Sequence, residues 1–229
     1  MLFRSIEAAL QLRESLNDGS TVTVVSMGPP QADVALREAL AMGCDDAYLV
    51  SAREFGGSDT YATSGIIAAA LKKIGYDLII TGRQAIDGDT AQVGPQIAEK
   101  LSLPQVSYVE EVIEATEEYV VVKRQYEDGY HIIKIKTPCL LTAIAELATP
   151  RYMSVRGIVE AYEAEIKVLG FEDLKDELEL DMIGLKGSPT NVFKSFTKEV
   201  KGAGTVYPDL TAEEAVDVIV KKLEEKFII

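Results

Sequence analysis

The sequence has few of the side chains on which most enzymes depend. It contains one histidine, His131, two cysteines, Cys44 and Cys139, and no tryptophan. The cysteines form no CxxC pair, so we expect neither zinc nor iron–sulfur ligation, but free thiols in a reducing cytoplasm. His131 lies in an alternating strand pattern, and neither a Walker A motif nor GxGxxG occurs. We therefore predict no catalytic and no metal-binding residues; a chain of this kind suits a protein whose cofactor performs the chemistry.

Long apolar runs and excess positive charge are also absent. No run is long enough to cross a bilayer, and no signal-peptide pattern opens the chain, so we expect no membrane insertion and a cytoplasmic location. The net charge of −14 repels phosphate backbones and argues against nucleic acid as a partner. Solubility alone also explains such acidity. The 229 residues are enough for one α/β domain with an appendage.

The first hundred residues alternate between short apolar strands and amphipathic helices. Gly43 and Gly75 end two of the helices. Strands that are apolar on both faces and alternate with helices indicate an α/β protein with a Rossmann-like parallel sheet sandwiched between helices. The expected helices span 3–16, 31–42, 60–74 and 89–101, and the expected strands 21–26, 47–50 and 77–81.

The middle of the chain has a different pattern. Residues 119–126 and 130–136 alternate apolar and polar around Asp128-Gly129, which predicts a β-hairpin. Strands are expected before and after it, over 106–113 and 138–145. Thr149-Pro150 then suits the start of a helix, with threonine as the N-cap and proline at the first helical position.

The C-terminal part is irregular over 170–209 and ends in a helix over 211–227 that begins with the capping box Thr211 and Glu214. We therefore predict two parts, an adenine-nucleotide-binding α/β domain over 1–169 and, over 170–229, a C-terminal arm and helix that packs on the partner subunit. The last helix has an apolar stripe that must be buried, either on its own domain or on a partner subunit. The stripe consists of Ala215, Ile219, Leu223 and Phe227.

The segment 82–96, GRQAIDGDTAQVGPQ, is the strongest candidate for a binding site. It follows an apolar strand and enters a helix, and ligands bind at the carboxyl ends of parallel strands. Free N–H groups at a helix start suit phosphate, and the glycines let the backbone approach a ligand. The predicted binding residues are Ser26, Met27, Gly28, Gly82, Asp87, Gly88, Asp89, Thr90, Ala91, Gln92, Val93 and Gly94. A capped helix without any ligand explains the same local pattern equally well.

These segments resemble those of electron transfer flavoprotein beta subunits. The resemblance covers residues 82–106, VSMGPPQA at 25–32 and REALAMGCDDAYLV at 37–50. It extends to a signature within 122–142, consisting of Val122, Arg124, Glu127, Asp128, Gly129, Ile133, Pro138, Leu140, Leu141 and Thr142. One position departs, because the family pattern expects Glu or Gln where His131 stands.

The resemblance implies a heterodimer in which a larger alpha subunit holds most of an FAD. The small subunit then binds AMP in ordinary members of the family and a second FAD in the bifurcating, NADH-linked group. The segment DGDTAQVGP is more similar to the bifurcating group. It implies transfer of electrons to or from acyl-CoA-type or other flavin dehydrogenases. Pro150-Arg151-Tyr152 resembles the start of the partner-recognition loop, which gives Arg151, Tyr152 and Val155 as recognition residues. Val155 is equally well spaced for the core face of a helix.

Members of that family begin with a short strand, K-I-x-V-x-V-K, that this sequence lacks. The resemblance therefore predicts a gap or an exposed edge in the sheet near residues 21–26. A different class, a free-standing adenine-nucleotide-binding protein without a redox role, remains as the alternative. Such proteins carry a glycine-rich phosphate loop such as SGGxDS after the first strand, and none occurs here.

Overall fold

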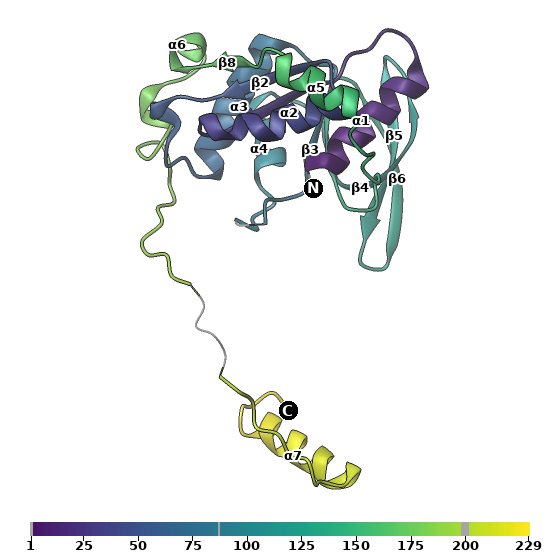
Figure 1. Cartoon of the computed structure of the whole chain (residues 1–229), viewed down its shortest axis with the longest axis vertical. Helices are drawn as coiled ribbons and strands as arrows, with labels where there is room; N and C mark the ends of the chain where they lie inside the picture. Colours follow the sequence, from purple (N-terminus) through teal and green to yellow (C-terminus); the bar gives the residue numbers. More distant parts are fainter. Residues whose placement is uncertain (1, 87, 198–201) are drawn as a thin grey trace. The chain divides into compact units, whose positions relative to one another are not determined.

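Alternating strands and helices make up most of the chain (Figure 1). The computed structural model describes residues 2–86, 88–197 and 202–229. It divides into two units, residues 1–191 and residues 192–229, each of which is described by itself. The first unit contains two sheets and the helices that cover them.

The smaller sheet is entirely parallel and has three strands in the order β1-β2-β8. These are β1 (Thr23–Met27), β2 (Asp46–Val50) and β8 (Lys167–Leu169). Helix α2 (Asp33–Met42) connects β1 to β2 and ends at Gly43, whose φ of 117° is in the left-handed region that glycine adopts freely.

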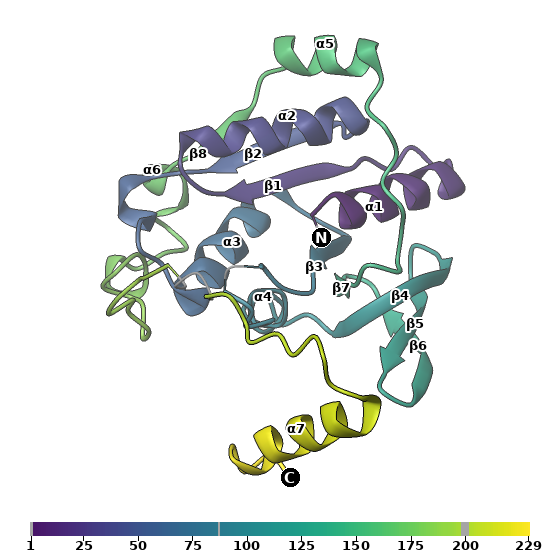
Figure 2. The same cartoon turned by 60° about the horizontal axis from the view of Figure 1, so that its bottom comes forward.

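The larger sheet has five strands in the order β3-β7-β4-β5-β6. β3, β7 and β4 are parallel, whereas β5 and β6 form the antiparallel hairpin predicted around Asp128-Gly129 (Figure 2). The strands are β3 (Leu78–Gly82), β4 (Gln105–Ala115), β5 (Tyr119–Tyr126), β6 (Gly129–Lys136) and β7 (Cys139–Ala143).

Helices cover the parallel strands. Asp59 caps α3 by accepting hydrogen bonds from the N–H groups of Tyr61 and Ala62. The helices of the first unit are α1 (Leu2–Leu16), α2, α3 (Thr60–Ile74), α4 (Val93–Lys100), α5 (Val155–Glu163) and α6 (Phe171–Leu174), with short 3-10 turns η1 (Pro30–Ala32), η2 (Arg53–Phe55) and η3 (Leu180–Met182). Within the described residues, no helix is long and apolar enough to cross a membrane.

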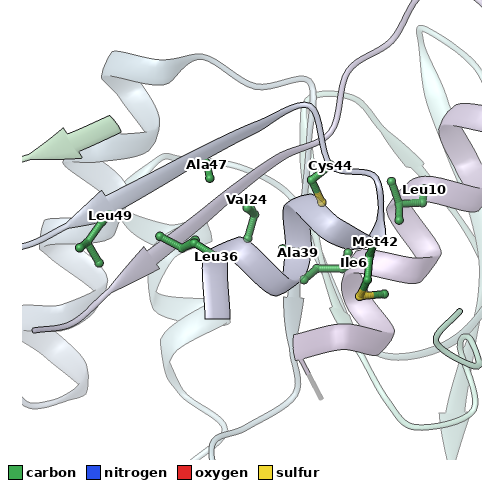
Figure 3. Packing of buried hydrophobic residues seen from close by; sticks show 9 residues of the cluster. All are labelled: Ile6, Leu10, Val24, Leu36, Ala39, Met42, Cys44, Ala47 and Leu49. Carbon is green, nitrogen blue, oxygen red and sulfur yellow. The ribbon is translucent and has the colours of Figure 1, made fainter. Parts of the chain in front are cut away.

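One core cluster shows how the helices are fixed to the smaller sheet (Figure 3). Its buried side chains come from α1, α2, β1 and β2: Ile6, Leu10, Val24, Leu36, Ala39, Met42, Cys44, Ala47 and Leu49. Burial raises the pKa of the Cys44 and Cys139 thiols to about 11, so both are protonated at neutral pH. They are packing residues and not nucleophiles.

The predicted α/β class, parallel sheet and hairpin are confirmed, but two predicted helix starts are wrong. The helix expected from residue 89 begins at Val93, because Asp89 and Ala91 have φ values of 49° and 53°, outside the right-handed helical region. The helix expected from Thr149-Pro150 begins at Val155, after Ser154, whose hydroxyl accepts a hydrogen bond from Gly157 N at 2.9 Å. Strand β8 was not predicted, because it has only three residues.

The second unit contains helix α7 (Ala212–Glu224). The capping box predicted at its start is present: Thr211 accepts from Glu214 N, and Glu214 accepts from Thr211 N. The helix ends at Glu224 and not at 227, and Phe227 has a φ of 54°. Whether its apolar stripe is buried on a partner subunit stays a prediction.

Gly157 provides a test of how closely α5 packs on α2. A Cβ atom added there would lie 2.6 Å from the carbonyl oxygen of Ala41, so Gly157→Ala should push α5 outward and destabilise the chain by about 1–3 kcal/mol in chemical denaturation. Gly65→Ala in α3 is the control: its nearest neighbour is Lys100 Nζ at 3.6 Å, and alanine should stabilise that helix by about 0.5–1 kcal/mol. Equal effects of the two substitutions would contradict the packing described.

Candidate functional site

The candidate site lies where parallel strands β1 and β3 end. Ser26 and Met27 are the last residues of β1, and Gly82 is the last residue of β3. Gly28 N donates to the Val50 carbonyl at 3.1 Å, which ties the loop after β1 to the end of β2. The loops after β1, β2 and β3 lead into α2, α3 and α4 respectively, so three helix starts follow strand ends here.

The loop before α4 exposes polar groups in a constrained backbone. Gly88, Asp89 and Thr90 are exposed, whereas Ala91 is half-buried. Asp89 N donates to the Ala85 carbonyl at 3.0 Å, and the Gln84 amide donates to the Asp89 carboxylate. The predicted residue Asp87 lies outside the described residues.

Gln92 connects the starts of two helices. It is the N-cap residue of α4, and its Oε1 accepts a hydrogen bond from Thr60 Oγ1, the first residue of α3, at 3.0 Å. One turn further, Gln96 Oε1 accepts from Ser64 Oγ at 3.1 Å. The starts of α3 and α4 therefore lie side by side.

The first turn of α4 suits an anion. No side chain caps this helix, so the N–H groups of Val93 and Gly94 have no capping side chain as acceptor. Both residues are predicted binding residues. The next residue is a proline, which has no N–H group. Backbone donors at a helix start, together with the positive end of the helix dipole, bind phosphate groups. The exposed Thr90 hydroxyl, shortly before Val93 in the chain, is a further donor.

Gly94 also has a packing role that the sequence did not indicate. A Cβ atom there would lie 2.6 Å from Thr81 Oγ1 and 2.9 Å from Thr142 Cγ2. Only glycine lets the start of α4 lie this close to β3 and β7, so Gly94 places the uncapped helix start at the strand ends.

A cavity of about 820 Å³ lies between β1 and β3. It is lined by Thr23 to Val25 of β1 and by Leu78 to Thr81 of β3. Ser26 and Gly82 are the next residue along each strand. The two loops thus stand at strand ends on opposite sides of one cavity, and the gap predicted near residues 21–26 is present.

A second group of predicted residues follows β7. Arg151, predicted for partner recognition, binds two carboxylates of α1: its Nε lies 2.8 Å from Glu7 Oε2, and its Nη1 lies 2.6 Å from Glu14 Oε1. Arg151 N also donates to Glu7 Oε2 at 3.1 Å. Arg151 therefore fixes the 145–154 loop to α1. Two glutamates seven residues apart on one helix face are the signal for this contact in the sequence.

Opposing effects set the pKa of Glu7. Only 3% of this residue is exposed, and burial raises its pKa, but the hydrogen bonds from Arg151 and Gln11 outweigh burial, so the pKa is lowered. Hydrogen bonds from the Arg151 side chain also lower the pKa of Glu14. The hydrogen bonds of Glu14 and Glu7 raise the pKa of Arg151 above its ordinary value. All three groups are charged at neutral pH.

Next to Arg151 the chain exposes apolar side chains. Tyr152 is 100% exposed and Val155 is 81% exposed, so the reading of Val155 as a helix core residue is wrong. Met153, Val159 and Tyr162 are exposed as well. We name these five residues the α5 patch. A fixed loop base with exposed apolar side chains is suited to binding a partner protein.

Two arginines at the larger sheet were not predicted as site residues. Arg83 follows β3 and lies over the Tyr108 ring at 5.6 Å, and Arg124 of β5 lies over the Tyr126 ring at 4.7 Å. The Nε atoms of both arginines are buried without a hydrogen-bond partner in the described structure. His131 pairs with Arg124 across the hairpin and packs on Tyr126, with ring centroids 4.3 Å apart. No group of three or more His, Cys, Asp or Glu residues in the described ranges could hold a metal ion.

Comparison with known proteins assigns the family. Residues 3–174 match the electron transfer flavoprotein domain. The chain is 55% identical over 231 aligned positions to the acryloyl-CoA reductase electron transfer subunit gamma of Anaerotignum propionicum, a match that covers 98% of this chain and 85% of the relative. It is 53% identical to the electron transfer flavoprotein subunit beta of Clostridium acetobutylicum and 51% identical to the caffeyl-CoA reductase-Etf complex subunit CarD of Acetobacterium woodii, with the same two coverages.

The chain therefore belongs to the electron transfer flavoprotein family. Its relatives are electron-transfer subunits, and it is an electron-transfer subunit of the beta type. The resemblance noted in the sequence is thus confirmed.

Acid should weaken the contact between α1 and Arg151. The lowered pKa of Glu7 contributes stability above the unfolded-state pKa of about 4.3, and this contribution is lost as the pH falls through the folded-state value. At pH 7 the Glu7→Gln variant should be less stable than the parent. Between about pH 5 and pH 3, its melting temperature should fall by less than that of the parent. Parallel melting curves of the two proteins over that range would contradict the assignment.

Proposed function

We propose that the chain is the beta subunit of a heterodimer and binds an adenine nucleotide with the loops at 26–28 and 82–94. The uncapped start of α4, with Thr90 beside it and the start of α3 bonded to it through Gln92, carries this proposal. The donors are backbone N–H groups and hydroxyls, which suit the phosphates of AMP or of FAD equally well. The residues present therefore fit the nucleotide that the family implies.

In this proposal a larger alpha subunit holds the FAD that accepts and donates electrons. The residues of this chain bind and position and do not react, so the chain acts as a carrier subunit rather than as an enzyme in its own right. Val93 N, Gly94 N and Thr90 Oγ1 would hold phosphate oxygens, and Gln92 would fix the loop to α3. The buried free thiols Cys44 and Cys139 support a reducing, cytoplasmic location.

Partner dehydrogenases are also part of the proposal. The names of two relatives refer to the reduction of acryloyl-CoA and of caffeyl-CoA. These names support a flavin dehydrogenase of the acyl-CoA type as the partner. They also support placing this chain in the NADH-linked, bifurcating group. A second FAD in this subunit would then receive hydride from NADH. The family match favours this reading over a free-standing nucleotide-binding protein without a redox role.

Nucleotide retention tests the site. In the complete heterodimer, Thr90→Ala and Gln92→Ala should each lower the amount of adenine nucleotide released on denaturation. Thr90→Ala removes a donor, and Gln92→Ala frees the loop from α3. We expect the double variant to release at most half as much nucleotide as the parent. Thr197→Ala, at an exposed threonine elsewhere in the chain, is the matched control. Chromatography of the released nucleotide also distinguishes AMP from FAD. Unchanged content in the double variant would place the site elsewhere.

Electron transfer tests the α5 patch. Val155→Ala in the heterodimer should slow electron transfer to the dehydrogenase several-fold, because it removes an exposed apolar anchor. The melting temperature should stay the same, since exposed substitutions change stability by about 0.5 kcal/mol or less. Val168→Ala, at an exposed valine of β8, is the control. Reduced stability with normal transfer rates would contradict the recognition role.

A further inference from the structure

Helix α5, which carries most of the α5 patch, is attached to the rest of the fold by little apolar contact. Among its nine residues, all of which the structure describes, Ala161 is the buried one. Gly157, one turn earlier, packs closely against the Ala41 carbonyl of α2. In Figure 2, α2 lies between α5 and the smaller sheet. Because an alanine and a glycine bury little apolar area, packing by itself holds α5 only weakly.

Arg37 of α2 provides polar contacts at the C-terminal end of α5. Its Nη1 donates to the carbonyl oxygens of Ala161 at 2.6 Å, Tyr162 at 3.2 Å and Ala164 at 3.3 Å. The last carbonyls of a helix have no acceptor role within the helix, and a cation beside them also interacts with the negative end of the helix dipole. Arg37 therefore caps α5 from a neighbouring helix.

The Arg37 side chain is itself held in place. It is partly buried, and its Nε lies 3.3 Å from Asp33 Oδ2, one turn earlier on α2. This ion pair orients the guanidinium toward α5. At the other end of α5, the Ser154 hydroxyl caps the first turn, and Arg151 fixes the preceding loop to α1. Both ends of α5 are thus fixed by polar contacts.

The contact of Arg37 with Tyr162 links this cap to the α5 patch. Arg37 holds the Tyr162 carbonyl, whereas the Tyr162 ring is exposed. Val155, Val159 and Tyr162 are spaced for one helical face, and all three are exposed. If the end of α5 were free to unwind, a partner would have to order Val159 and Tyr162 on binding, and ordering side chains and backbone weakens binding.

We propose that Arg37 is a positioning residue for protein recognition. By capping α5, it presents the α5 patch to the partner dehydrogenase as one rigid face. Arg37 itself does not touch the partner in this proposal and acts through the backbone of α5. The inference rests on the proposed role of the α5 patch in binding a dehydrogenase.

The test measures electron transfer from the complete heterodimer to a flavin dehydrogenase of the acyl-CoA type, with the heterodimer concentration varied. Arg37→Gln should raise the KM for the heterodimer about threefold or more, because binding must then order the end of α5. The kcat should stay the same, since the hydrogen bonds of Arg37 go to α5 and Asp33. Hydrogen exchange in the variant should become faster in residues 159–164.

A conservative variant and a matched control separate positioning from general stability. All three hydrogen bonds come from one nitrogen, so a lysine ammonium can replace part of them, and Arg37→Lys should give an intermediate KM. Lys73 of α3 makes the same kind of contact elsewhere, because its Nζ donates to the Asp173 carbonyl of α6 at 2.7 Å. Lys73→Gln should leave KM unchanged. Equal effects of Arg37→Gln and Lys73→Gln on KM would overturn the proposal.

Val155→Ala distinguishes this inference from the proposed function. In a Val155→Ala background, Arg37→Gln should raise KM by less than in the parent, because both changes act on one surface. If Val155→Ala raises KM and Arg37→Gln does not, the positioning role is wrong and the α5 patch remains the recognition surface. If neither variant raises KM, the α5 patch is not that surface, and both proposals are wrong.

Circular dichroism checks that the variants fold. If Arg37→Gln does not fold, Arg37→Lys decides. Faster exchange in residues 159–164 together with a raised KM would support the positioning role, and faster exchange with the KM of the parent would overturn it.

Discussion

The fold depends on helices that cover both faces of its parallel strands. α1 on one side and α3 with α4 on the other bury their apolar faces against the strands and so hold β1 and β3 on opposite walls of one cavity. Parallel strands need cover on both faces, and these helices provide it in both sheets. The positions of the strand ends, and so of the candidate site, follow from this packing.

The two functional regions are held in different ways. At the strand ends, Gly94 lets α4 approach Thr81 and Thr142, and Gln92 joins α4 to α3, so an uncapped helix start is fixed without a capping side chain. Near α5, the ion pairs of Arg151 with Glu7 and Glu14 fix the loop base, while Tyr152 and Val155 stay exposed. A rigid base with free binding groups is what recognition of a nucleotide or a protein requires.

The errors in the sequence-based predictions have physical causes. Gly-Asp-Thr suits a helix start, but the left-handed backbone at Asp89 and Ala91 delays α4 to Val93. Thr149-Pro150 suits a helix start as well, but Arg151 is bound to α1, so α5 begins only after Ser154. In the second case a local preference gave way to a conformation stabilised by contacts with residues far away in the chain. The binding residues themselves remain predictions from the strand-loop-helix pattern.

Local pattern by itself determined the class of fold, most helices and strands, the hairpin at Asp128-Gly129 and the capping box at Thr211. These depend on periodicity, turn residues and caps, whose effects extend over a few neighbouring residues. Only the tertiary structure decided that Glu7 is buried against Arg151, that Gly94 serves packing, that Val155 is exposed and that β1 and β3 face one cavity. Those facts depend on contacts between residues far apart in the chain, which no local pattern records.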